Sequence, residues 1–551
     1  MKKEFRLIQA NKLWILFMVF SILVDQIPLG MTVLIEVFGR IALKQESHLI
    51  LPGIIFLLLW ICGCLLFRIA YSKSKSKVIY EWNCRMKSTL MDRLLRRKVA
   101  DFTAKDRAEY ISVFNNDIKF VEEKYLLCLN KIASNLALFT ASLIYSFRIN
   151  VLLTLVILAA GLFIFFMTKK LSGKAAQDHD AHFLSLKTFN ESLQDGLYGY
   201  ETLYRSLKNA NFMKLFSGKL DKVEKNHAEA VYSSGMLVSL INYLSISIQA
   251  SLFLALALAV YYGKMDGIYY PVMMSLMNLI IYPMEAIGEN YGSIKSSEEV
   301  RKRLLEEIRS GDSEKEEPAH PSAKPEKNEA PSIAFRDVDF SYGDKPIFEK
   351  ANFEIRSKEH ILLCGDSGSG KSTILKLLTG ESEAGGGEIL LGERPASSLS
   401  RQEIFDQISV IPQHPMMFRT SILQNIVLFE EEEEIDFERL ERVLHKAGLH
   451  SYLDSLPEGI HTILTDAGSN LSGGEKQRIE IARALYRDTP IILIDEATAG
   501  LDLGRAKSLE EIFASFDKTL ISISHRRDID LSKFYDRSLR VKDRKILSEE
   551  L

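Results

Sequence analysis

Two stretches in the second half of the chain carry residues suited to phosphate chemistry. The first, "GDSGSGKST" at 365–373, follows the apolar run "HILLCG" and leads into the amphipathic "ILKLLTG". A glycine-rich turn between a strand and a helix points backbone amides at phosphate, while its lysine and serine supply a positive charge and a Mg²⁺ ligand. We therefore expect ATP phosphates to be bound by Gly365, Ser367, Gly368, Ser369, Gly370, Lys371, Ser372 and Thr373, with Ser372 also on the metal.

The second stretch, "PIILIDEATAG" at 490–500, has the pattern of a buried strand that ends in two carboxylates. Buried acids need a partner, and Mg²⁺ is the obvious one. We assign Asp495 to Mg²⁺, through water, and Glu496 to polarising the water that attacks ATP. A strand end that is merely capped by acids is the structural alternative.

A third stretch, "LSGGE" at 471–475, is also rich in serine and glycine, but it lacks a lysine and follows no apolar strand. It opens the helical pattern "GEKQRIEIARALYR", whose N-terminus favours an anion. We therefore do not interpret it as a second independent nucleotide site.

The length and composition of the chain indicate how these stretches are organised. At 551 residues the chain is too long for one ordinary core, and a formal net charge of -3 argues against a nucleic-acid binder. From 333 onward, short apolar strands alternate with amphipathic helices, which predicts an α/β core with a largely parallel sheet. Residues 310–332 are charged and rich in proline, as in a disordered tether. We expect a transmembrane domain over 1–309, a linker over 310–332 and an ATPase domain over 333–551.

The first domain contains six segments that are long and apolar enough to span a bilayer as helices. They lie at 13–35, 49–71, 128–147, 150–168, 236–262 and 267–288. The connections after the second and fourth segments are long and basic, so the positive-inside rule places these connections and both termini in the cytoplasm. Both have helical periodicity and no proline, and we expect helices that continue out of the membrane and turn near 115–119 and 198–205.

Together these motifs resemble the ATP-binding cassette (ABC) family, and the resemblance extends over essentially the whole chain. "LSGGE" is similar to the family signature, which covers the ATP held by the phosphate loop of a second nucleotide domain. The resemblance implies that Ser472, Gly473 and Gly474 contact ATP in this way. It also implies that Asp502, in "AGLD", lies in a loop that crosses the dimer interface. One chain would then contain halves of two different sites.

Three further motifs extend this resemblance. "FSYGDKPIFEKANFEI" implies that Tyr342 stacks on adenine, and "VIPQHPMMF" implies that Gln413 meets Mg²⁺ and the membrane domain. "ISISHR" places His525 where the family has a histidine that senses the γ-phosphate. A plain surface tyrosine and a structural histidine are the alternatives for Tyr342 and His525.

The resemblance implies a six-helix transmembrane bundle of ABC exporter type, followed by an α/β P-loop ATPase with a helical subdomain. "AEYISVFNNDIKFVEE" resembles the first coupling region of such exporters, although Ala108 replaces the usual glycine. "TDAGSNLSGG" resembles the stretch before the signature, with Thr465 and Asp466 in place of glycine and glutamate. The signature ends in Glu475 rather than the commoner glutamine, and "AGLD" departs from the commoner serine-alanine form.

Three functions are compatible with these features. The first is an ATP hydrolase coupled to transport (a translocase), which exports amphipathic small molecules or peptides by alternating access. The second is a flippase of lipids or lipid-linked precursors, and the third is an ATP-gated channel or sensor subunit. Importers of the family commonly have separate permease chains, which disfavours uptake. The lysine-rich chain with short loops suggests a bacterial plasma (inner) membrane, where it would pair with a second half-transporter in a homodimer or, alternatively, a heterodimer.

One acid lies inside the first apolar segment. Asp25 falls near the hydrocarbon middle, where an acid costs roughly +2.5 to +3.5 kcal/mol, so it should face a partner or water rather than lipid. Pro28 can loosen the helix beside it. We expect it opposite Met273, Met274, Met277 and Asn278 of the sixth segment. It would be a cation-attracting contact in the transport pathway, a structural acid bonded to a neighbouring helix, or an acid near the outer interface if the span is displaced.

Overall fold

The computed structural model describes residues 12–309, 331–366, 368–465, 468–499, 501–526 and 528–550. Their contacts form two compact units. The first contains residues 12–97 and 105–309, and the second contains residues 98–104 and the described residues of 331–550. The predicted linker therefore lies outside the described residues, except for Pro331 and Ser332. Asp466 also lies outside the described residues.

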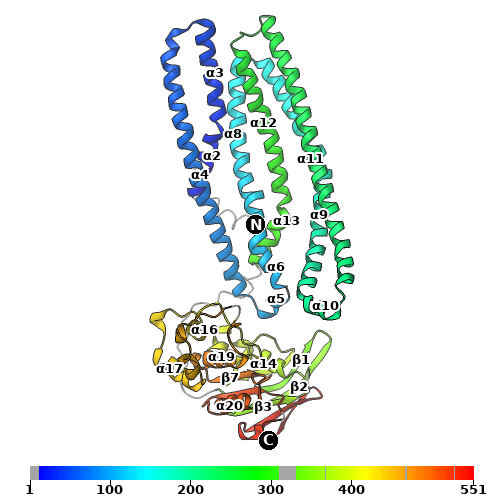
Figure 1. The fold of residues 1–551 in the computed structure, drawn as a ribbon, viewed down its shortest axis with the longest axis vertical. Coiled ribbons are helices and arrows are strands. Elements are labelled where there is room, and N and C mark those ends of the chain that lie inside the picture. Colours follow the sequence, from blue (N-terminus) through cyan, green and yellow to red (C-terminus); the bar gives the residue numbers. More distant parts are fainter. Residues whose placement is uncertain are drawn as a thin grey trace. The chain divides into compact units, whose positions relative to one another are not determined.

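Long helices build the first unit (Figure 1). They are α2 (Lys12–Asp25), α3 (Ile27–Lys44), α4 (Ile50–Leu95), α8 (Leu127–Ile149), α9 (Val151–Tyr198), α11 (Asn209–Tyr261), α12 (Tyr269–Ser296) and α13 (Glu298–Arg309). α9 lies along α11, while α12 lies against both α8 and α9. Within the described residues, five helical stretches are long and apolar enough to cross a membrane, and each contains one predicted segment to within two residues of that segment's ends. The remaining segment, 150–168, begins with a shorter apolar stretch, Val151–Ile164.

The first predicted turn between these helices, 115–119, is wrong because the chain turns earlier, between Leu95 and Arg107. α4 ends at Leu95 and α6 (Arg107–Ser112) begins after Asp106, whose side chain caps the new helix by accepting from the Ala108 amide at 3.1 Å. Residues 113–126 then continue in helical conformation instead of turning at 115–119. The N-cap at Asp106, in "KDRAEY", is the local signal that marks the turn. The second turn contains α10 (Tyr200–Ser206), which overlaps the predicted region 198–205.

The predicted neighbours of Asp25 are also wrong. Asp25 ends α2 and lies within hydrogen-bond reach of Ser134 of α8. A second contact joins the same helices, because Asn130 donates to the Ser21 hydroxyl at 2.8 Å. The helical conformation continues through Gln26, whose amide donates to the Ile22 carbonyl at 3.1 Å. A hydrogen bond to Ser134 offsets the cost of burying the Asp25 carboxylate, which explains why this acid lies toward α8. The methionines of α12 lie elsewhere: Met273 is fully buried in the core among α8, α9 and α11.

The second unit contains two sheets (Figure 1). One is a four-stranded sheet in the order β2-β1-β4-β5, all antiparallel. The other has six strands in the order β10-β9-β3-β8-β7-β6, and only the β10–β9 pair is antiparallel, which confirms the predicted largely parallel sheet. The strands are β1 (Ile333–Tyr342), β2 (Lys345–Ile355), β3 (His360–Gly365), β4 (Gly386–Leu391), β5 (Arg394–Pro395), β6 (Ile408–Ile411), β7 (Ile491–Asp495), β8 (Thr519–Ile523), β9 (Arg537–Lys542) and β10 (Lys545–Glu549).

The large sheet is buried on both faces, and its strand residues alternate between two cores. In β7, Ile492 and Ile494 contribute to one core, while Ile491 and Leu493 contribute to the other. This is the two-residue period of a strand covered on both sides. The antiparallel sheet belongs to the second core, and the sequence analysis did not predict it as a separate layer.

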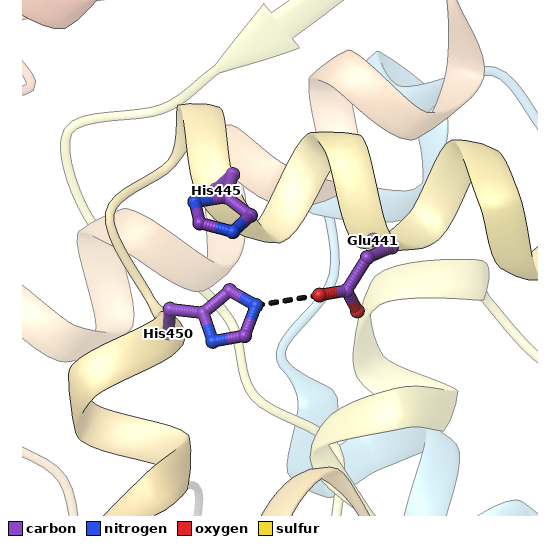
Figure 2. Close-up of side chains that lie close together, drawn as sticks. All are labelled: Glu441, His445 and His450. Atoms are coloured by element: carbon purple, nitrogen blue, oxygen red, sulfur yellow. Dashed lines mark hydrogen bonds and ion pairs between the residues drawn. The ribbon is translucent and has the colours of Figure 1, made fainter.

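Among the described residues, five helices cover the other core: α16 (Ile422–Val427), α17 (Phe437–Lys446), α18 (His450–Asp454), α19 (Gly473–Arg487) and α20 (Leu503–Ala514). Two more, α14 (Lys371–Leu378) and α15 (Arg401–Phe405), pack in the second core with the antiparallel sheet. α16 and α17 both pack on α19. α18 begins after a short turn from α17, and its first residue, His450, forms an ion pair with Glu441 at 2.6 Å (Figure 2).

Glu307 of α13 is buried and holds two basic residues of the first unit. Arg97 donates to Glu307 Oε2 at 2.7 Å, and Lys105 forms an ion pair with Oε1. Burial would raise the pKa of Glu307, but the hydrogen bonds from Lys105 and Arg97 outweigh it and hold the pKa below its ordinary value. Arg97 and Lys105 lie on either side of residues 98–104 in the chain, so one carboxylate fixes both flanks of that segment.

Replacing Glu307 should therefore destabilise the first unit strongly. Glu307→Ala leaves the buried guanidinium of Arg97 without a carboxylate, a change that costs about 3–5 kcal/mol. Denaturant unfolding of the purified protein measures it, with Glu306→Ala, an exposed neighbour on the same helix, as the matched control. Because the pKa of Glu307 is lowered, its contribution is present above the ordinary glutamate pKa and is lost on acidification. Equal losses for both variants would contradict this role.

Candidate functional site

The phosphate loop joins β3 to α14 and needs glycine at both of its ends. Gly365 has φ +147, and a Cβ there would lie 2.6 Å from the Val541 carbonyl oxygen. Gly370 has φ +109, and a Cβ there would lie 2.6 Å from Ile347. Both positions combine a backbone conformation that favours glycine with a close approach to neighbouring atoms. The loop is therefore held on its tight path by the residues around it.

Lys371 points back into this loop. Its ammonium donates to the carbonyl oxygens of Gly365 at 3.0 Å and Asp366 at 2.8 Å. Burial lowers the pKa of Lys371, although nearby carboxylates such as Glu496 act in the opposite direction. The ammonium thus lies inside the loop. A bound phosphate would replace the two carbonyl oxygens as its hydrogen-bond acceptor.

The loop also offers polar groups that fit ATP and Mg²⁺. The Ser369 hydroxyl oxygen is buried and has no hydrogen-bond partner among the residues that the structure describes. The Ser372 hydroxyl lies within hydrogen-bond reach of Asp495 at the end of β7, so two hard oxygen donors meet at one place. Burial, followed by the neighbouring Glu496, raises the pKa of Asp495, and a bound cation would reverse this shift. Ser367 lies outside the described residues.

The three residues predicted to be catalytic lie together. Gln413 Nε2 donates to Glu496 Oε2 at 2.8 Å, and His525 Nε2 lies 3.3 Å from Glu496 Oε1. Glu496 follows β7 in a left-handed conformation, φ +48, and its amide donates to the Ile523 carbonyl of β8 at 3.1 Å. His525 follows β8, so the parallel pairing of the two strands brings the imidazole to the carboxylate.

The two other predicted contact regions lie apart from this cluster in the chain and have local partners. Tyr342 ends β1, and its ring is half exposed and packs edge-on against Phe340 with centroids 4.9 Å apart. Ser472 is the N-cap of α19, followed by Gly473 and Gly474. The Ser472 hydroxyl accepts from the Glu475 amide, and the Glu475 carboxylate accepts from the Ser472 amide at 2.7 Å. Glu475, the departure from glutamine, thus completes a capping box.

Asp502 also caps a helix. Its carboxylate accepts from the Arg505 amide at 3.0 Å at the start of α20. The predicted interface role of Asp502 remains a prediction, as do the roles of Tyr342 and the signature.

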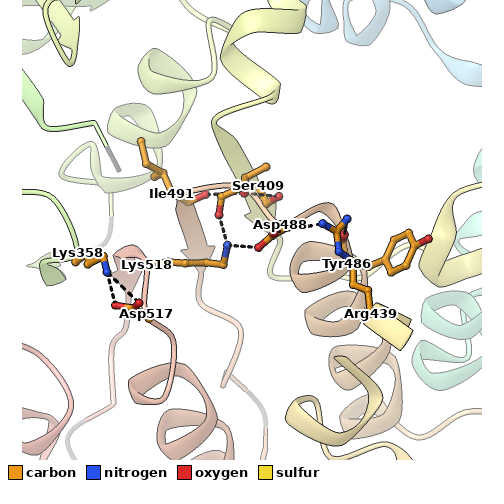
Figure 3. Close-up of polar contacts among 9 residues, drawn as sticks. Lys358, Ser409, Arg439, Tyr486, Asp488, Ile491, Asp517 and Lys518 are labelled. Carbon is orange, nitrogen blue, oxygen red and sulfur yellow. Dashed lines mark hydrogen bonds and ion pairs between the residues drawn. The ribbon is translucent and has the colours of Figure 1, made fainter. Parts of the chain in front are cut away.

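The opposite end of β7 is anchored by a polar cluster (Figure 3). Lys518 donates to Asp488 Oδ1 at 2.9 Å and to the Thr489 carbonyl at 2.6 Å. Asp488, the C-cap residue of α19, also forms an ion pair with Arg439 at 3.3 Å. Thr489 in turn donates to Ser409 of β6 at 2.9 Å. These contacts fix the start of β7. Because the strand is extended and buried, they also help to fix the positions of Asp495 and Glu496 at its other end.

Arg526 is a residue that the sequence analysis did not assign. Its guanidinium donates to the carbonyl oxygens of Thr498 and Leu501, both at 3.0 Å, and it pairs with Asp528. It thus holds the segment that follows Glu496 against the segment that contains His525. The arginine is the last residue of "ISISHR", directly after the histidine. Its position in the sequence does not distinguish it from an ordinary surface arginine, so its role could not be predicted.

Comparisons with known proteins match both units. The family model described as "ABC transporter transmembrane region" matches residues 14–284, and the model described as "ABC transporter" matches residues 348–499. Over 197 residues, the chain is 40% identical to the Bacillus subtilis protein named "Glutathione/L-cysteine transport system ATP-binding/permease protein CydD", covering 35% of this chain and 34% of that protein. It is 35% identical over 199 residues to "Mycobactin import ATP-binding/permease protein IrtB" of Mycolicibacterium thermoresistibile, covering 36% and 34%.

These matches span about a third of the length of each curated relative. A solved structure, titled "Structure of a bacterial Atm1-family ABC exporter with ATP bound", shares the fold over 96% of this chain and 93% of its own, with a TM-score of 0.80 and 20% identity. The predicted fold class, an exporter-type transmembrane region followed by an α/β nucleotide-binding domain, is confirmed.

Removing the Arg526 guanidinium should loosen the segment after Glu496. Arg526→Ala leaves two carbonyl oxygens without their donor, a loss of about 1–3 kcal/mol, and should lower ATP hydrolysis because Glu496 is no longer held in place. Thermal unfolding and ATPase rates measure the two effects. Arg540→Ala, which removes an exposed ion pair with Glu549, is the matched control and should cost no more than about 1 kcal/mol. Similar behaviour of the two variants would contradict this role.

Proposed function

Since the chain belongs to the ABC transporter family, we propose that it is a half-transporter that hydrolyses ATP to export amphipathic small molecules or peptides across a membrane. The observation that carries the proposal is the cluster of Gln413, Glu496 and His525 at the end of β7. A carboxylate held by two positioned neighbours, beside a phosphate loop, is suited to activating water for attack on a γ-phosphate.

Each residue of the cluster has a defined task in this proposal. Glu496 Oε1 accepts the proton of the attacking water, and His525 keeps that oxygen in place. Gln413 donates through its nitrogen to Glu496, which leaves its amide oxygen as an acceptor for a cation. Mg²⁺, when bound, would neutralise phosphate charge, and Ser372, Gln413 and, through water, Asp495 would hold it.

The signature requires a second nucleotide domain in this proposal. The capping box occupies the side chains and the amides of Ser472 and Glu475, while the amides of Gly473 and Gly474 in the first turn of α19 remain donors for an anion. We propose that Gly473 and Gly474 use these amides, and Ser472 the proton of its hydroxyl, on ATP held by the phosphate loop of a partner. ATP binding would then close the dimer, and hydrolysis at Glu496 would reopen it, which biases the membrane domain between two states.

The direction and the substrate belong to the proposal as well. One relative is named an import protein although it combines ATP-binding and permease parts in its name, so fusion of the two domains does not by itself favour export. A lipid flippase is the main alternative, and an ATP-gated channel or sensor subunit is another. Transport and ATPase assays in nanodiscs and vesicles, with peptide, drug and lipid panels, distinguish them. Stimulation by lipids alone would favour the flippase, and ion currents would favour the channel. We place the protein in a bacterial plasma membrane with both termini cytoplasmic.

Removing the carboxylate of Glu496 should stop hydrolysis while ATP still binds. Glu496→Gln should lower turnover by about a hundredfold to ten-thousandfold, the range for loss of a positioned acid–base group, and should trap a closed dimer. ATPase rates and nucleotide-binding titrations test this. Glu511→Gln, an exposed acid on α20, is the matched control and should leave turnover unchanged. Hydrolysis by Glu496→Gln at a rate near wild type would refute the assignment.

A change in the signature should separate the two halves of the site. Ser472→Arg should leave ATP binding at the chain's own phosphate loop intact but block hydrolysis, because Ser472 serves the partner's nucleotide. Fluorescent ATP titration and ATPase rates of the full chain measure both quantities. Loss of ATP binding together with hydrolysis would contradict a shared site.

The partner is proposed to be a second copy of this chain. The phosphate loop, Asp495, Glu496, the signature and His525 are all present in the one sequence, so two copies would contain two equivalent sites. Native mass measurement of the chain expressed alone, together with its ATPase activity, decides the question. An inactive monomer would favour a heterodimer.

A further inference from the structure

Two histidines and a glutamate meet at the turn between α17 and α18 (Figure 2). Glu441 and His445 are four residues apart in α17 and so share one face of the helix. His450 opens α18, and its ring lies against His445 with centroids 4.2 Å apart. One oxygen of Glu441 and one ring nitrogen of each histidine lie within 4.8 Å of one another. The buried side of α17, with Leu440, Val443 and Leu444, faces the core, which leaves this face accessible to solvent.

The donor set indicates which ligand would bind. Two imidazoles and one carboxylate are the protein ligands of many Zn²⁺ sites that keep a fourth position open, whereas Mg²⁺ and Ca²⁺ prefer oxygen donors. Tetrahedral Zn²⁺ places its donor atoms about 3.3 Å apart, so the three side chains need only small rotations to close on one ion. Asp454 Oδ2 lies 3.8 Å from His450 Nδ1, on the opposite edge of the ring from the Glu441 contact. A carboxylate at that nitrogen orients the other nitrogen toward a metal.

The scaffold beneath the cluster is rigid. Arg439 of α17 donates to the Tyr486 carbonyl at 3.3 Å and pairs with Asp488, which attaches this helix to the end of α19 (Figure 3). The turn itself is attached to α19 as well, since Arg478 donates to the Ala447 carbonyl at 2.9 Å. Gly448, with φ +67, lies so close to Arg478 that a Cβ there would be 2.2 Å from its guanidinium nitrogen. The backbone that positions the three ligands is therefore fixed independently of any ion.

We propose that Glu441, His445 and His450 form a binding site for Zn²⁺ that fastens α17 to α18 beside the signature helix α19. The ion would replace the single ion pair between Glu441 and His450 by three bonds across the turn. Because Arg478 lies one turn after Glu475, a tighter turn would restrain the helix that begins at the signature. This second consequence, an effect on ATP hydrolysis, rests on the proposed function, whereas metal binding does not.

Cobalt provides a spectroscopic probe for the binding site. The full-length protein, purified with a tag that contains no histidine and stripped of metal, is titrated with Co²⁺ and then with competing Zn²⁺ while visible absorption is recorded. We expect one tetrahedral Co²⁺ per chain, displaced by Zn²⁺. His445→Ala and His450→Ala should each weaken binding by at least about tenfold, since even loss of an outer contact costs that much. Glu441→Gln should weaken it too.

The control is His461→Ala, an exposed histidine of the same helical region outside the cluster, which should bind Co²⁺ like wild type. ATP binding by every variant, measured in parallel, shows that the domain is folded. The proposal fails if wild type gives no tetrahedral Co²⁺ spectrum, or if the His445→Ala, His450→Ala double variant keeps it; Glu441 and His450 then form an ion pair only. Zn²⁺ should slow ATP hydrolysis in wild type and in His461→Ala but not in the double variant, and an unchanged rate with intact Co²⁺ binding would refute only the effect on α19.

Discussion

The parallel pairing of β3, β7 and β8 is the constraint on which the catalytic cluster depends. Parallel strands end at the same edge of a sheet, so the phosphate loop, the two carboxylates and His525 are brought together although they are far apart in the chain. Burial of the sheet on both faces fixes its register, because a shift by one residue would exchange the two cores. The position of Glu496 therefore depends on the apolar packing of the preceding residues of β7 in the two cores.

The same principle of anchoring recurs at the polar positions. Arg526 holds the segment after Glu496, Lys518 holds the start of β7, and Glu307 holds both flanks of residues 98–104. Each of these charged groups contacts two backbone or side-chain groups, and Arg526 and Lys518 lie beside the segments that contain the candidate catalytic residues. Charged residues outside the proposed ATP site thus help to position the residues that are proposed to act on ATP.

Much of this arrangement could be predicted because its signals are local. About ten residues of sequence are enough to predict the strand, loop and helix around Lys371, and likewise the acids at the end of β7. The length of the apolar runs is enough to predict the membrane-spanning helices. The contacts that were missed are non-local or depend on a single residue. The first turn ends at the N-cap residue Asp106, and Asp25 lies within hydrogen-bond reach of Ser134, a residue more than a hundred positions away in the chain. Arg526 and the Glu441, His445 and His450 cluster required the tertiary fold, since nothing in the sequence shows which side chains face one another.

The contacts of Asp488 have a mechanical consequence. This residue ends the signature helix and is tied both to Lys518 beside β8 and to Arg439 of α17. The helix has 15 residues, so it extends about 22 Å from that tether to Ser472. A rotation of α19 about this tethered end would displace the signature most, because Ser472 lies at the opposite end of the helix. Over about 22 Å, a tilt of only about 5° would displace the signature by about 2 Å, comparable to the difference between a hydrogen bond made and one broken.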